Sequence, residues 1–516
     1  MTRPLSQQLL YTVLTASALL CLSLPPISAF AEQVQSSGEE ADGSGEESDG
    51  FGEESDGFDE GFEELDDLKI DEMSAPPAPS ALRVDGFVRS HWAAWSQRAA
   101  EDMWAKGRQS LDLSARYKQG GLRLILEGHV EYDLLYPYDS SREAPRLDPA
   151  QREAYERQYI PGQQLIAYRL GSLELSTGRQ VVTWGEADGL SALDMINPRD
   201  QREPGVADID DLRLAVWLTR LRYARGPFDL DLIVRHEGAY GLLIPPLADY
   251  SPLRSTLPPT FAQLLAGKEV GYAHDREGVS ADTQSYFVRA LYRGRGIDLG
   301  LYAASLIDLQ GVFELSDPAA LLAQLADPQL TRFELPQAHK RFELYGLSWA
   351  TTMGSWLFKG ELALSHKRPQ NVGSPEQFGA ITVEEISALT WATSLSYTGI
   401  SDLSLSLEYQ QGAQLGEERE LFIPPSAPII SLRASQNLLR ERLSLNLIAL
   451  SFEPTASSLA ARGALLRADA LYKLSDQVKL SGGYVHYVSG DDFGPFAGLD
   501  EHGRLFAQLR WDFTLY

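Results

Sequence analysis

The segment from Glu186 to Arg213 concentrates acidic and basic side chains among residues that favour turns. In a loop that narrows a water-filled passage, fixed charges of both signs select solutes by charge and size. We therefore consider residues 185–211 as a constriction loop, with the candidate residues Glu186, Asp188, Asp194, Asn197, Arg199, Asp200, Arg202 and Glu203. The alternative is a structural latch, in which Asn197, Pro198 and Asp200 form a turn and the charged groups pair with the surrounding wall.

Hydrolysis is a second chemistry to consider in this sequence. Gly189, Leu190 and Ser191 resemble the start of a hydrolase nucleophile elbow, but its second glycine is missing. His129 and Glu131 share one face of a predicted strand and could orient a nucleophile, yet any water-filled interior needs such residues. The sequence favours a protein that is not an enzyme, with an outer-membrane hydrolase as the weaker alternative.

Metal ligands are sparse in this chain. Asp208, Asp210 and Asp211 offer oxygen ligands for calcium, as do Asp491 and Asp492, but neither group has EF-hand spacing. The eight histidines are scattered without an H-x-x-x-H pair, and the one cysteine, Cys21, lies in the predicted signal peptide. We therefore expect no metal and no cofactor.

Alternation of apolar and polar residues indicates strands along most of the chain. Between Leu122 and Leu134, every second residue is apolar or glycine, and the other face is mostly charged. The same pattern recurs from Phe228, Trp356 and Leu403, and it is typical of barrel strands with one face toward lipid and one toward water. The candidate residues of a lumen wall are Glu127, His129, Glu131, Arg235, Lys359 and Glu361.

A closed transmembrane antiparallel β-barrel is the fold that this pattern predicts. No segment after the first 31 residues has about 18 uninterrupted apolar residues, and only a closed barrel pairs every backbone group of a strand in lipid. Tight turns alternate with long loops and predict about 18 strands, with 16 as the alternative. Thr260, Asp317 and Asp148 precede short helix signals in the long loops.

The N-terminal region differs in composition from the rest. Residues 1–31 contain an apolar run that ends in Ala29-Phe30-Ala31, which predicts a cleaved signal peptide. Residues 32–80 contain an acidic GEESDGF repeat and a proline-rich linker, which we expect to be disordered, and residues 81–516 form the predicted barrel. Much of the net charge of −27 lies in the acidic repeat, and no basic stripe suggests nucleic-acid binding.

Four short motifs occur in one order between Tyr168 and Tyr223: Gly178-Arg179-Gln180, Trp184-Gly185-Glu186-Ala187-Asp188-Gly189, Ile196-Asn197-Pro198-Arg199-Asp200 and Asp210-Asp211-Leu212-Arg213. In these motifs the chain resembles a porin-like outer-membrane β-barrel family of Gram-negative bacteria, a domain of unknown function. The resemblance implies an outer-membrane channel for passive passage of small solutes, hydrophobic or amphipathic ones among them. A plugged barrel that acts as a surface scaffold is the alternative.

The resemblance also implies the surroundings of the protein. We expect contacts with outer-membrane lipid, lipopolysaccharide and the barrel-assembly machinery, and the acidic leader should lie in the periplasm. A homo-oligomer is compatible with the sequence, although no apolar seam between subunits can be identified from one chain.

Overall fold

The computed structural model describes residues 81–98, 103–138, 155–206, 212–251, 259–315, 317–373, 381–421, 427–455, 457–490 and 494–515. The signal peptide and acidic leader predicted from the sequence lie outside these residues. So do the helix start predicted at Asp148 and the two aspartate groups considered for calcium.

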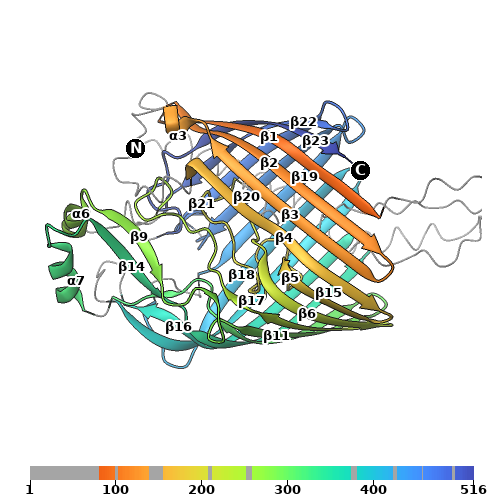
Figure 1. Cartoon of the computed structure of the whole chain (residues 1–516), viewed down its shortest axis with the longest axis horizontal. Coiled ribbons are helices and arrows are strands. Elements are labelled where there is room, and N and C mark those ends of the chain that lie inside the picture. Colours follow the sequence, from red (N-terminus) through yellow and green to blue (C-terminus); the bar gives the residue numbers. More distant parts are fainter. Residues whose placement is uncertain are drawn as a thin grey trace, which may run out of the picture. The chain divides into compact units, whose positions relative to one another are not determined.

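In the described residues, eighteen strands form one antiparallel sheet, which closes on itself because β1 pairs with β23 (Figure 1). The predicted all-β barrel is confirmed, with 18 strands rather than 16. The barrel strands are β1 (Leu82–Trp95), β2 (Trp104–Gln119), β3 (Leu122–Asp133), β4 (Arg157–Leu170), β5 (Leu173–Gln180), β6 (Val216–Arg225), β7 (Phe228–Arg235), β11 (Ser285–Arg293), β12 (Asp298–Ile307), β15 (Arg341–Met353), β16 (Trp356–Val372), β17 (Thr382–Ile400), β18 (Leu403–Leu415), β19 (Ile429–Leu438), β20 (Leu443–Phe452), β21 (Ala464–Lys473), β22 (Val478–Val488) and β23 (Arg504–Thr514).

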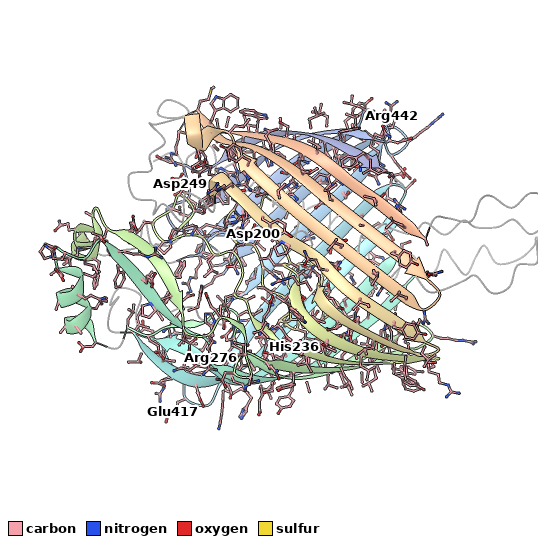
Figure 2. All side chains as sticks on the ribbon, viewed as in Figure 1. Asp200, His236, Asp249, Arg276, Glu417 and Arg442 are labelled. Atoms are coloured by element: carbon pink, nitrogen blue, oxygen red, sulfur yellow. The ribbon has the colours of Figure 1, made fainter. Side chains whose placement is uncertain are left out.

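Tight turns and long loops alternate around the barrel, as the sequence predicts. Gly120 and Gly171 occupy two of the tight turns with φ of 57° and 59°, a conformation in which a side chain would be strained. Figure 2 labels Arg442 in a tight turn at one end of the barrel and Glu417 in a long loop toward the other end. Because the strands are antiparallel and tight turns alternate with long loops, the long loops emerge at the end of the barrel opposite to the start of β1 and the end of β23.

The two faces of each strand differ as the alternation predicts. On β3, Leu124 and Leu126 point outward and are exposed, whereas Glu131 and Asp133 point inward. On β7, Phe228 is 62% exposed while its neighbour Asp229 is 5% exposed. An apolar side chain exposed on the outside of a closed sheet is stable in lipid, and an inward carboxylate requires partners or water.

Among the described loop residues, two small sheets and the two short helices α6 (Pro259–Leu265) and α7 (Pro318–Leu325) lie at the mouth of the barrel (Figure 1). One sheet pairs β8 (Glu237–Gly238) with β10 (Gly278–Val279), and the other joins β9 (Glu269–His274), β13 (Val312–Phe313) and β14 (Arg332–Ala338). Helices α6 and α7 pack on the second sheet through Phe261, Leu325 and Phe333. The Asp317 carboxylate caps α7 by accepting the Ala320 N–H at 3.0 Å.

A third short helix, α3 (Leu135–Tyr138), follows β3. Among the described residues, no helix is long and apolar enough to cross a lipid bilayer.

Candidate constriction loop inside the barrel

We call the connection between β5 and β6, residues 181–215, the inserted loop. Its described residues, 181–206 and 212–215, turn into the barrel interior. Trp184, Leu193 and Ile196 on this loop are completely buried. They pack against inward residues of the wall, among them Phe287 of β11 and Tyr302 of β12. Burial of a large aromatic and two aliphatic side chains by the wall gives the loop a hydrophobic reason to enter the lumen.

Glu361, on β16, holds the first half of the inserted loop. Its two carboxylate oxygens accept hydrogen bonds at 2.6–3.2 Å from the backbone N–H groups of Glu186, Ala187, Ala192 and Leu193. The Ser191 hydroxyl donates to the same carboxylate at 2.9 Å. Gly185 fits this arrangement because a Cβ there would lie 2.4 Å from Oε1 of Glu361 and because its φ is 91°. The carboxylate oxygens are thus satisfied by backbone N–H groups and a hydroxyl group of the loop.

Glu408, on β18, acts in the same way on the next loop residues. Its oxygens accept the N–H groups of Asp188, Gly189 and Leu190 at 2.7–3.1 Å. Lys359 of β16 donates to the Asp188 carboxylate at 2.7 Å. Residues 186–190, which we call the loop tip, are therefore fixed against the β16–β18 wall.

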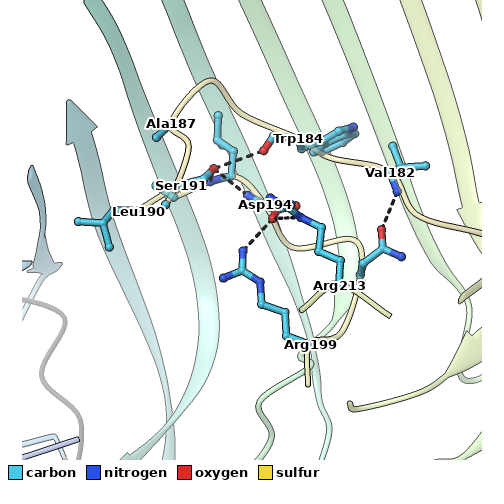
Figure 3. Close-up of polar contacts among 12 residues, drawn as sticks. Val182, Trp184, Ala187, Leu190, Ser191, Asp194, Arg199 and Arg213 are labelled. Atoms are coloured by element: carbon cyan, nitrogen blue, oxygen red, sulfur yellow. Dashed lines mark hydrogen bonds and ion pairs between the residues drawn. The ribbon is translucent and has the colours of Figure 1, made fainter. Parts of the chain in front are cut away.

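The base of the inserted loop is closed by two further side chains. Asn197 accepts the Val182 N–H at 2.8 Å and donates to the carbonyls of Gln180 and Leu214, both at 2.9 Å. Asp194 accepts hydrogen bonds from Arg199 and Arg213 at 2.7 and 2.9 Å, which Figure 3 shows as dashed lines. These contacts join the start of the loop at Gln180 and Val182 to its end at Arg213 and Leu214. The base of the inserted loop is therefore held closed.

The second half of the inserted loop contacts the opposite wall through side-chain charges. Glu203 forms ion pairs with Lys106 and Arg108 of β2 and lies 3.8 Å from Arg504 of β23. Burial would raise the pKa of Glu203, but these three cations outweigh it and hold that pKa well below its usual range. Glu203 therefore stays ionised at neutral pH.

Neighbouring residues extend this second contact region. Arg202 pairs with Asp200 at 2.6 Å and lies 3.8 Å from Glu131 of β3. The Tyr487 hydroxyl of β22 donates to the Pro204 carbonyl at 2.5 Å. The loop thus touches strands on both sides of the barrel, and its predicted charged residues mostly have wall or loop partners.

The structure corrects the surroundings of several candidate residues. The sequence predicts a water-filled lumen around Arg235 and Glu361, but the inserted loop and its neighbours cover both side chains. Arg235 instead donates to the Ile196 carbonyl at 2.9 Å and to the Ser285 hydroxyl at 3.1 Å. Asn197 is also buried, because its side chain satisfies backbone groups rather than facing a passage.

The other candidate wall residues face inward and have partners. Glu127 pairs with Arg116 at 3.3 Å, and His129 lies between Asp112 and Glu131 at 3.4 and 3.1 Å. These groups lie outside the contact region around Glu361. The predicted wall residues are therefore spread over several strands and form no single site.

Sequence reasoning did not select Glu408, Lys106, Arg108 or Arg504 as site residues. Each of these residues occupies an inward position in a strand of alternating polarity. The alternation indicates which side chains point inward, but it does not indicate which of them contact the loop. The contacts join residues far apart in the sequence, 97 positions for Lys106 and Glu203 and 220 positions for Asp188 and Glu408.

Metal binding has no support within the described part of the chain, where no group of three or more His, Cys, Asp or Glu side chains could hold an ion. The predicted absence of a cofactor stays a prediction.

The closed sheet and the inserted loop define a β-barrel with a loop folded into its lumen. A family model described as "Protein of unknown function (DUF1302)" matches residues 162–418, which include the whole inserted loop. No curated protein has significant sequence similarity to this chain.

Several solved structures resemble the chain in fold. Pseudomonas aeruginosa OccK11 (OpdR) has 12% identity and a TM-score of 0.44, and the match covers 84% of this chain and 96% of that one. Acinetobacter baumannii OccAB2 has 10% identity and a TM-score of 0.47, over 84% and 98%. Pseudomonas aeruginosa OpdK, solved with vanillate, has 13% identity and a TM-score of 0.44, over 84% and 98%.

Proposed function

We propose that this protein is a porin-like channel of the outer membrane, through which small solutes pass down their concentration gradient. The closed ladder leaves no unpaired strand edge, which is the condition for crossing a bilayer with strands. Exposed leucine, tyrosine and tryptophan side chains on the outward faces, such as Leu301, Tyr168 and Trp511, supply the lipid-facing surface.

The observation that carries the proposal is the position of the inserted loop. Glu361 and Glu408 hold its first half on one side of the barrel, and Lys106, Arg108 and Arg504 hold its second half on the other. A segment held at both sides of a lumen reduces the cross-section through which a solute can move. The loop is therefore the candidate constriction.

The resemblance noted in the sequence extends this proposal to the solute and the partners. We propose small solutes, including hydrophobic or amphipathic ones, and contacts with outer-membrane lipid, lipopolysaccharide and the barrel-assembly machinery. The acidic leader would lie in the periplasm. Chemical cross-linking in membranes would test whether the chain forms a homo-oligomer.

Deletion of Asp188 to Asp208 tests the constriction in the full-length protein. We expect stepwise single-channel currents from the wild-type chain in planar lipid bilayers and a larger conductance from the deletion, because the loop no longer narrows the lumen. Shortening helix α7 in a mouth loop is the matched control and should leave conductance unchanged. Equal conductance of the wild-type and deletion channels would reject the loop as the constriction.

A plugged barrel that acts as a scaffold is the second candidate. It is favoured by the apolar packing of Trp184, Leu193 and Ile196 inside the barrel. A second apolar cluster, which includes Tyr250, Tyr487 and Phe496, also lies where loop and wall residues meet. Folded protein that inserts into bilayers but never conducts would support the scaffold over the channel.

A further inference from the structure

The contacts of the inserted loop leave one part of the barrel wall with little connection to it. The first half binds β16 and β18, and the second half binds β2, β22 and β23. Around the barrel, β19, β20 and β21 lie between these two contact regions. Within the described residues, no hydrogen bond or ion pair joins the inserted loop to β19 or β20. This arc is where a passage beside the loop would run.

Four inward side chains of β19 and β20 are small and neutral. Pairing between strands places Ser435 opposite Asn446 and Asn437 opposite Ser444, and each pair is joined by a hydrogen bond, at 2.9 and 2.7 Å. Serine and asparagine side chains leave room near the wall and bind water readily. A solute that follows β19 and β20 would meet one charged side chain of these two strands.

Arg433 is the one charged residue on β19 and β20, whereas β21 carries Arg467 and Asp469, which pair with each other. A Cβ at Gly189 would lie 2.9 Å from Nη2 of Arg433, so the guanidinium group lies beside the loop tip. The nearby Glu408 carboxylate already accepts three N–H groups of the loop tip, and no ion pair with Arg433 forms. In the described part of the chain, Arg433 has no hydrogen-bond or ion-pair partner.

Two other inward arginines, Arg467 and Arg222, differ from Arg433 in having an acidic partner. Arg467 pairs with Asp469 at 2.7 Å on β21, and Arg222 pairs with Asp229 at 2.6 Å across β6 and β7. A paired charge produces a weak field at a distance, whereas an unpaired cation at a narrow point attracts anions and repels cations.

We infer that the solute passes along the β19–β21 wall and that Arg433 is a selectivity residue that gives the channel a preference for anions, including carboxylate-bearing solutes. The inference rests on the proposed channel function. A guanidinium group suits this role because it is always charged and can bind a carboxylate through two parallel N–H donors.

Reversal potentials across a planar bilayer with a KCl gradient test the inference with full-length protein. Arg433→Gln should lower the ratio of chloride to potassium permeability about two- to fivefold, because one unpaired charge is lost at the narrow point. Arg433→Lys keeps the charge and should stay close to wild type. Arg222→Gln removes one lumenal cation across the barrel and should shift the ratio less.

The outcomes separate the inference from the proposed function. If wild-type protein conducts and Arg433→Gln leaves the permeability ratio unchanged, or Arg222→Gln changes it as much, the assignment of Arg433 is wrong and the channel stands. If folded wild-type protein produces no currents, the channel function itself is overturned, and the role of Arg433 with it.

Discussion

The two halves of the inserted loop are held by different chemistry. Residues 186–193 bind the wall through backbone N–H groups, which donate to the carboxylates of Glu361 and Glu408. Residues 200–204 bind mainly through charged side chains, with Glu203 among three cations. The first half therefore depends on wall residues and on its backbone path, whereas the second half depends on its own side chains.

This difference predicts which substitutions each half of the inserted loop should tolerate. Loop residues such as Ala187 and Leu190 contribute backbone groups to the wall carboxylates, so many side chains could serve there. Gly185 cannot be replaced as easily, because a Cβ would collide with Ser191 and Glu361. In the second half, loss of the Glu203 carboxylate removes the acidic partner of the buried Lys106 and Arg504, whereas Arg108 keeps Glu131.

The largest effect is expected from Glu203→Gln. Removal of this anion leaves Lys106, Arg108 and Arg504 close together, and we expect a loss of about 3 kcal/mol in the free energy of unfolding. Urea-induced unfolding of the barrel in detergent or lipid would measure it. Asp188→Asn removes an exposed loop carboxylate and should cost much less. If both variants unfold at the same urea concentration, the ion cluster does not anchor the second half.

A smaller loss of stability but a clear change in conduction is expected from Glu361→Gln. The amide has one acceptor oxygen where the carboxylate has two, and its NH₂ group would face N–H donors of the loop. We expect a cost of about 2 kcal/mol and a loop tip that moves away from β16, which raises single-channel conductance.

Glu127→Gln is the matched control for that experiment, because Glu127 is an inward carboxylate outside the contacts around Glu361. A Glu361→Gln channel with wild-type conductance and current noise would show that the backbone contacts do not fix the loop tip.

The smallest expected effect is a change in ion selectivity with pH, in which Glu186 and Glu203 should behave differently. Burial raises the pKa of Glu186 above its ordinary value, although Lys359 partly opposes this shift. A raised pKa means that the folded state binds the proton of Glu186 more tightly than the unfolded state does. Protonation of Glu186 at lower pH therefore does not reduce the free energy of unfolding. Glu203 has a lowered pKa, so its contribution to stability persists at neutral and mildly acidic pH and is lost only in strong acid.

We therefore expect a modest increase in anion preference between pH 7 and pH 5 (about twofold or less), because one negative charge disappears at the loop tip. Reversal potentials at the two pH values would measure it, and Glu186→Gln should abolish the change. If the Glu186→Gln channel shows the same change in anion preference between pH 7 and pH 5 as wild type, a group other than Glu186 causes the change.

Much of the fold could be predicted from local sequence. Alternation in segments such as Leu122–Asp133 specifies inward and outward faces, and turns such as Gly120-Gly121 divide the strands. The helix after Asp317 could be predicted because its capping residue and proline act within a few positions. Residues 185–211 could be predicted as a loop because their turn-forming residues also act within a few positions of the chain.

The sequence by itself predicted the closed barrel, a count of about 18 or 16 strands and the candidate loop, because alternation, turns and caps are interactions between near neighbours in the chain. Only the tertiary structure decided that the loop enters the lumen, that Glu361 and Glu408 bind its backbone, and that Glu203 meets Lys106, Arg108 and Arg504. Those contacts depend on the order in which strands close around the barrel. Curvature brings together residues whose spacing along the chain carries no information about their distance in space.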